Sequence, residues 1–123
     1  MDIYEPINFT RNWNGKLGCE FFTTIRLHDP KKYFKGAKKT VFLNKTILSN
    51  VEIFEVFPVK FAYIKPWMKI QDTGLMPDKF DGMFHTMYKN KVTNWNTQLF
   101  DVMLLRTIQR LEPLPHESVA TPP

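Results

Sequence analysis

The stretch Phe21-Phe22-Thr23-Thr24-Ile25-Arg26-Leu27 decides the fold class of this chain. Side chains of two kinds alternate along it, which is typical of a β-strand with different environments on its two faces. We expect positions 21, 23, 25 and 27 to form the core face. The opposite face then presents Phe22, Thr24 and Arg26, a mixed surface that needs polar partners. A threonine and an arginine two positions apart on one face could contact the same small ligand.

The segments around this strand predict a β-rich domain. Four further extended segments are expected, at residues 7–9, 40–44, 51–64 and 98–108. A turn at Asn44-Lys45 separates the second segment from the third. Pro58 cannot donate a hydrogen bond to a sheet, so the long third segment is expected to bend at Phe57-Pro58.

Two segments between the strands favour helix. Residues 66–72 predict a short helical turn that ends near Gly74, a residue suited to a C-terminal cap. Residues 77–90 predict the main helix, beginning at a proline and carrying an apolar stripe. The stripe, interpreted as core packing rather than as a ligand surface, comprises Phe80, Met83, Phe84, Met87 and Tyr88.

Length and composition bound the class of protein. The chain has 123 residues and 43% hydrophobic residues, which suits one domain at residues 1–111 followed by a proline-rich flexible tail at residues 112–123. Cys19 is the single cysteine and the three histidines are widely spaced, so we expect no disulfide, no metal site and no cofactor. No stretch resembles a signal peptide or a membrane span, and a cytoplasmic location is expected.

The charge balance favours an anionic partner. Seventeen lysine and arginine residues stand against twelve aspartate and glutamate residues, giving a net charge of +5. Such a balance is common in proteins that bind nucleic acid or nucleotides. Many of the lysines fall in one loop, residues 31–39, where the alternative is ordinary solvated surface.

Six residues are candidates for a binding site. Arg26 can present a planar fork to a phosphate or a base edge, Thr24 can hydrogen-bond, and Asp72 can accept from a donor. The alternative is that an Arg26–Asp72 salt bridge merely closes the barrel. Lys16 adds a second cation in the preceding loop. Trp13 could pin the N-terminal arm onto the core or stack a base, and Phe22 could also stack one.

The order of these motifs resembles the ASCH domains of the PUA-like superfamily. The resemblance covers roughly residues 20–108: Thr24-Ile25-Arg26, a basic turn with Gly36, two strands, Asp72-Thr73-Gly74 and an amphipathic helix. It implies a small, partly closed β-barrel with flanking helices and a cleft used for RNA or modified nucleosides. Some small members hydrolyse N4-acetylcytidine with a lysine, a threonine and a glutamate. Here Thr24 matches the threonine, but Phe21 occupies the lysine position.

We therefore expect an α+β fold, a PUA-like partly closed barrel with one main amphipathic helix and short flanking helical turns. The leading functional hypothesis is an RNA-binding or nucleotide-binding module. One alternative is a hydrolase of a modified nucleoside, with Thr24 and Asp72 as catalytic candidates and Lys16 in place of the missing lysine. Another is a protein-interaction or accessory protein of a phage or mobile element.

Overall fold

A computed structural model describes residues 2–111 as one curled sheet with helical segments packed at one end of it. The expected tail at residues 112–123 lies outside the described residues. In chain order the elements are β1 (Pro6–Phe9), η1 (Trp13–Gly18), β2 (Phe21–Leu27), β3 (Lys38–Leu43), β4 (Thr46–Lys60), η2 (Phe61–Tyr63), α1 (Pro66–Thr73), α2 (Pro77–Met87) and β5 (Leu99–Arg110). Here η denotes a 3₁₀ helix.

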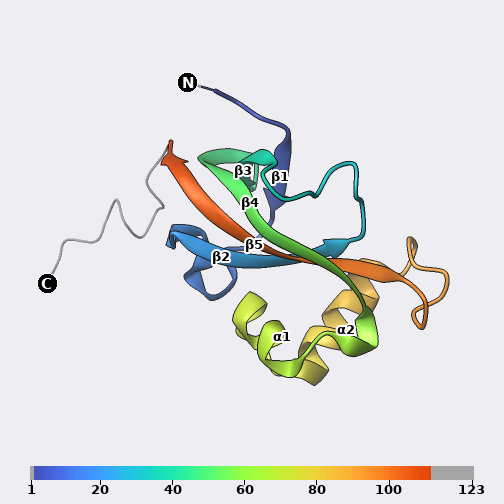
Figure 1. The fold of residues 1–123 in the computed structure, drawn as a ribbon. Coiled ribbons are helices and arrows are strands. Elements are labelled where there is room, and N and C mark those ends of the chain that lie inside the picture. The colour runs from blue at the N-terminus through green and yellow to red at the C-terminus, as the bar shows by residue number, and fades with distance from the viewer. Residues whose placement is uncertain (1, 112–123) are drawn as a thin grey trace, which may run out of the picture.

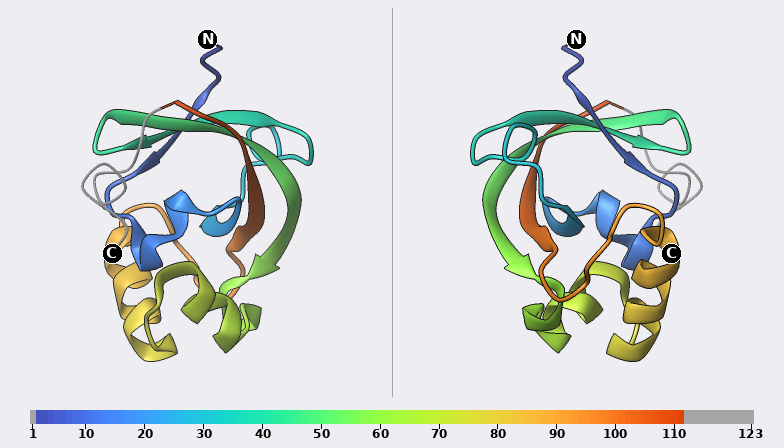
Figure 2. Two further views of the ribbon diagram at one scale, coloured as in Figure 1. Left: turned by 90° about the vertical axis from the view of Figure 1, so that its left-hand side faces the viewer. Right: turned by 90° about the vertical axis from the view of Figure 1, so that its right-hand side faces the viewer.

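The five strands form a single sheet in the order β1-β3-β4-β5-β2. β1 runs parallel to β3, and the other three pairings are antiparallel. The sheet curls strongly, so that it forms a half-barrel, and both α-helices lie at the end opposite the N-terminus (Figures 1 and 2). The predicted α+β, partly closed barrel is therefore confirmed.

The curl brings the two edge strands together without a ladder between them. Phe9 of β1 and Phe22 of β2 meet edge to face, with ring centroids 6.2 Å apart. The Arg26 guanidinium donates a hydrogen bond from Nη2 to the carbonyl oxygen of Asn8 at 2.7 Å. Side chains thus close the half-barrel where backbone pairing ends.

The helical predictions are correct in position and differ in extent. α1 ends at a left-handed Gly74 (φ 77°), whose amide donates to the Ile70 carbonyl, as expected for a glycine cap. α2 begins at Pro77, as predicted, but ends at Met87 instead of residue 90. Within residues 2–111, no helix is both long enough and apolar enough to cross a membrane.

β4 differs most from its prediction. It begins five residues earlier than expected, after a turn in which Asn44 and Lys45 both have positive φ, and continues without a break through Pro58. Its irregularities lie instead at Asn50/Val51 and between residues 53 and 55. Beyond Glu52, β4 pairs only with β5, so Pro58 lies where the other side of the strand has no ladder partner.

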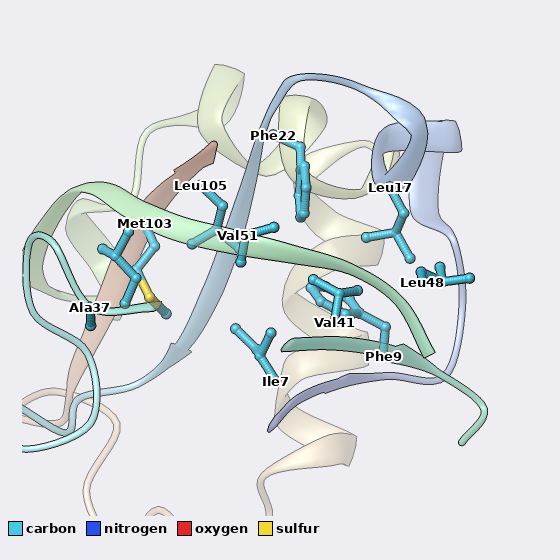
Figure 3. Packing of buried hydrophobic residues seen from close by; sticks show 11 residues of the cluster. Ile7, Phe9, Leu17, Phe22, Ala37, Val41, Leu48, Val51, Met103 and Leu105 are labelled. Atoms are coloured by element: carbon cyan, nitrogen blue, oxygen red, sulfur yellow. The ribbon is translucent and has the colours of Figure 1, made fainter. Parts of the chain in front are cut away.

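The core is divided into two clusters. The larger one fills the inside of the half-barrel and takes side chains from η1 and from all five strands. Figure 3 shows Phe9, Leu17, Phe22 and Val41 among its members. The second cluster lies between the sheet and the helices. Its buried members are Ile25, Phe61, Ile64, Phe80, Phe84, Val92, Phe100 and Val102.

This division corrects the expected core face of β2. Phe21 was expected inside but is 41% exposed, whereas Phe22 is 4% exposed and packs inside the half-barrel. Ile25, on the face of Phe21, is buried as well, because the helices cover that part of the outer face. Both faces of the strand therefore carry buried residues, and alternation alone does not tell which face is the interior.

Candidate functional site

A cleft that contains several charged and polar groups opens where the two edge strands approach each other. It encloses about 170 Å³ between the end of β1, η1, β2, the C-terminal end of α1 and one side of α2. The side chains and backbone that line it come from Asn8, Phe9, Thr10, Arg11, Trp13, Lys16, Thr24, Ile25, Arg26, Asp72, Thr73, Met83, Phe84, Met87 and Tyr88.

A buried ion pair lies in this cleft. Lys16 Nζ lies 2.8 Å from Asp72 Oδ1, and the two side chains are only 7% and 6% exposed. The Thr23 hydroxyl donates a second hydrogen bond to the same carboxylate oxygen at 3.3 Å. The Gly74 cap ends α1 two residues after Asp72, and a left-handed turn at Asn14 and Gly15 precedes Lys16. The C-terminal end of α1 and the turn within η1 thus bring together two side chains that lie 56 positions apart in the sequence.

Burial shifts both members of the pair toward their neutral forms. Desolvation raises the pKa of the Asp72 carboxyl, although the charge of Lys16 and the hydrogen bonds oppose this shift. Desolvation likewise lowers the pKa of the Lys16 ammonium, partly offset by Asp72 and reinforced by the charge of Arg26. Desolvation and the mutual attraction of Lys16 and Asp72 thus act in opposite directions on the pKa of each group.

Arg26 and Thr24 form the β2 side of the cleft. Arg26 Nε donates to the Thr24 hydroxyl at 3.2 Å, and the guanidinium lies over the ring of Phe9, 4.7 Å from its centroid. Thr24 is 4% exposed, whereas Arg26 is half-buried. The alternative of an Arg26–Asp72 salt bridge is not observed, because Asp72 pairs with Lys16 instead. Arg26 hence keeps donor capacity toward the cleft beyond its two observed hydrogen bonds.

Aromatic and thioether side chains form the walls. Trp13 is half-buried, and the Arg11 guanidinium lies 5.0 Å from the centroid of its ring. On the α2 side, Tyr88 is half-buried and Met87 is 53% exposed. Burial also raises the pKa of the Tyr88 hydroxyl, which therefore remains protonated and able to donate. A planar ligand could lie against these walls while its polar edge meets the ion pair.

The structure brings five of the six predicted site residues to this cleft: Trp13, Lys16, Thr24, Arg26 and Asp72. Phe22 is the exception. Its ring is buried against Phe9 in the larger cluster, so it cannot stack a ligand, and its expected stacking role is corrected.

Sequence reasoning missed several cleft residues. Arg11 lies two positions before Trp13 in the sequence, and cations beside aromatic rings are common on surfaces that bind single strands. Met87 and Tyr88 were assigned to core packing with the rest of the α2 stripe. Phe80 and Phe84 are buried as that interpretation requires, but the C-terminal part of the stripe faces the cleft. Asn8 contributes through its backbone, for which the sequence holds no signal.

Within residues 2–111, no three histidine, cysteine, aspartate or glutamate side chains lie close enough together to hold a metal ion. The residues that line the cleft themselves carry charge, hydrogen-bonding groups and aromatic surface.

Comparison with known proteins supports the fold. The chain is similar to the crystal structure of protein EF3133 from Enterococcus faecalis V583, of the family model DUF984, with a TM-score of 0.57. The similarity covers 94% of this chain and 88% of that one, at 9% sequence identity. No family model matches the sequence, and no curated protein matches it.

Proposed function

We propose that this protein binds single-stranded RNA or a nucleotide, with one base held in the cleft between the edge strands. The observation that carries the proposal is the combination of three cations, Arg11, Lys16 and Arg26, with the aromatic wall of Trp13 around a single buried carboxylate. The cations can bind phosphate. A base can stack on the aromatic ring of Trp13 and form hydrogen bonds with the buried polar side chains of the cleft.

The charges suit a ligand whose phosphate lies at the mouth of the cleft and whose base points inward. Arg11 is exposed and Arg26 is half-buried, so both can reach a phosphate. Lys16 is buried beside Asp72, so it can donate only to a group that enters the cleft. A volume of about 170 Å³ lies below the ~300–1,000 Å³ of pockets that enclose a whole ligand, which favours insertion of a single base.

The test is a salt-titrated anisotropy measurement with a labelled single-stranded RNA. Arg26→Ala is compared with Arg106→Ala, an exposed arginine of β5 outside the cleft. If Arg26 neutralises one phosphate, its loss weakens binding and makes the log–log salt slope less negative by about 0.7. Arg106→Ala should leave both quantities unchanged. Equal effects of the two variants, or no binding at low salt, would contradict the proposal.

The fold and the order of motifs also support a divergent ASCH-like domain. The curled sheet with helices at one end agrees with the small barrel that the resemblance implies. Thr24 and Asp72 lie in one cleft, as a shared ligand site requires.

One observation favours a second candidate function, hydrolysis of a modified nucleoside such as N4-acetylcytidine. Lys16 takes the place beside Asp72 and Thr24 that Phe21, exposed on the outer face, cannot fill. Burial lowers the pKa of the Lys16 ammonium, which is the direction that a general base at this position requires. The expected products are cytidine and acetate, and turnover should be abolished in Thr24→Ala. Absence of turnover by the wild-type protein would exclude this candidate.

A further inference from the structure

A second cationic surface lies on the loop that follows β2. Residues 31–39 hold five lysines and no acidic residue. Two of the five are paired with carboxylates, in the pairs Lys39–Glu5 and Lys35–Glu55. Lys31 and Lys32 form no ion pair with any of residues 2–111. We call residues 30–36 the basic turn.

Hydrogen bonds anchor the basic turn at both ends. The Asp29 carbonyl oxygen accepts from two amides of the turn, at 3.0 and 2.8 Å, which closes one helical turn. The buried Asp101 carboxylate of β5 accepts from the Asp29 amide at 2.9 Å and contacts the His28 ring at 2.8 Å. At the other end, the amide of Gly36 donates to the Ile53 carbonyl oxygen at 2.8 Å. A surface held in this way loses little entropy when it binds a ligand.

Aromatic rings lie among the cations of this surface. The ammonium groups of Lys32 and Lys39 lie 5.8 and 5.7 Å from the centroid of the Tyr33 ring. Phe34, the next residue, is 51% exposed, although a phenylalanine ring gains free energy by burial. Cations interleaved with accessible aromatic rings are the means by which proteins bind single strands, with the cations on the phosphates and the rings on the bases.

The basic turn lies next to the cleft of the proposed function. Burial is the main cause of the raised pKa of the Tyr88 hydroxyl, and the Tyr33 hydroxyl contributes to it. The two phenols are therefore close to each other. Because Tyr88 lines the cleft and Tyr33 carries the Lys32 ammonium over its ring, the cations of the turn continue those of the cleft.

The strand β1 gives the distance between the two cationic surfaces. Arg26 of the cleft donates to the carbonyl oxygen of Asn8, and Lys39 pairs with Glu5, three residues earlier in the chain. Three strand residues span about 10 Å. At about 3.4 Å between stacked nucleotides, a strand needs about three further nucleotides to cover this distance.

We propose that an RNA strand with one base in the cleft continues along β1 onto the basic turn, where Lys31 and Lys32 contact phosphates and Phe34 stacks a second base. This inference rests on the proposed function and makes its ligand a strand of several nucleotides. A free nucleotide would fill the cleft alone and leave the basic turn unused.

The test compares two labelled RNAs by salt-titrated anisotropy, a dinucleotide and a single strand of about 12 nucleotides, which lies within the usual range of site sizes. The wild-type protein should bind the longer RNA more tightly and with a steeper salt dependence. Lys31→Gln/Lys32→Gln should make the log–log slope for the longer RNA less negative by about 0.7 for each lysine that contacts a phosphate. The slope for the dinucleotide should not change.

A matched control removes the same charge elsewhere. Lys60→Gln/Lys65→Gln replaces two exposed lysines, at the end of β4 and directly before α1, and should change neither slope. Phe34→Ala tests the second base without altering the charge. It should weaken binding of the longer RNA about tenfold, as expected for the loss of one stacked base, and leave the salt slope and the dinucleotide affinity unchanged.

The inference and the proposed function fail in different ways. If the two lysine variants have equal effects, or if Lys31→Gln/Lys32→Gln leaves the slope for the longer RNA unchanged, the basic turn does not bind RNA and the inference alone is wrong. If Arg26→Ala leaves the binding of both RNAs unchanged, the cleft is not the ligand site and the proposed function is wrong. Absence of binding by either RNA at low salt would overturn both.

Discussion

Removing one partner of the buried Lys16–Asp72 pair should destabilise the fold severely. At 2.8 Å and an effective dielectric constant of about 20, the attraction amounts to about 6 kcal/mol. The desolvation of both groups offsets part of it, yet a single substitution leaves the other charge buried and unpaired. Lys16→Met and Asp72→Leu should therefore each lower the free energy of unfolding by about 3–5 kcal/mol.

The double variant Lys16→Met/Asp72→Leu distinguishes this explanation from a simple packing defect. It removes both charges, so it should recover most of the stability that either single variant loses. The exposed pair Lys35–Glu55, with side chains 72% and 55% exposed, is the matched control. Lys35→Met should change stability by less than about 1 kcal/mol. Urea denaturation followed by circular dichroism measures all four variants.

The stability of Lys16→Met should also depend on pH, and the shifted pKa of Asp72 determines in which direction. In Lys16→Met, the pKa of Asp72 should rise further above its ordinary value of 3.8, because the cation that opposes desolvation is gone. The folded variant then holds a proton that its unfolded state releases, so it loses stability as the pH rises from 3.8 through the raised pKa. The loss in free energy of unfolding relative to wild type is therefore smallest near pH 3.8 and grows toward neutral pH. A deficit below about 1 kcal/mol, or strictly additive effects in the double variant, would refute the reasoning.

Three further predictions concern the fold and can be checked by the same denaturation measurement. Lys45→Gly should stabilise the protein by about 1 kcal/mol, because Lys45 has a φ of 71° that glycine adopts without strain. Phe80→Ala should cost about 3–5 kcal/mol, since this fully buried ring stacks on Phe84 at 4.2 Å, whereas Phe57→Ala on the surface should cost far less. Gly74→Ala should lower the free energy of unfolding by about 1–2 kcal/mol, because residue 74 has a φ of 77° that alanine adopts only with strain. Unchanged stability in any of the three variants would contradict the cause given for it.

The local features of this fold were predictable because local chemistry determines them. The start of α2 at Pro77, the cap at Gly74 and the turn at Asn44 all follow from residues whose backbone preferences are strong. These preferences act over a few residues and need no knowledge of the partner strands.

The faces of the strands were less predictable, because helices cover part of the outer surface of the sheet. Phe22 and Ile25 are both buried although they lie on opposite faces of β2. In β4, the irregularity between residues 53 and 55 shifts the phase of alternation, so the pattern before it does not extend to the residues after it.

The candidate site was predictable in its components and not in its pairing. Thr24 and Arg26 are on one face of one strand, and alternation suffices to place them together. A salt bridge between Asp72 and Arg26 was one alternative, but the helical turn of η1 places Lys16 beside Asp72 instead. Such contacts over 56 residues depend on how the elements pack, and neither periodicity nor composition encodes them.

The location of bound RNA tests the central claim most directly. The indole N–H signals of Trp13, Trp67 and Trp95 report on the cleft, helix α1 and the second core cluster respectively. On titration with a short single-stranded RNA, the Trp13 signal should shift progressively to saturation while the other two stay in place. A shift of Trp67 without Trp13, or no shift of any indole at saturating RNA, would contradict the assignment of the cleft as the ligand site.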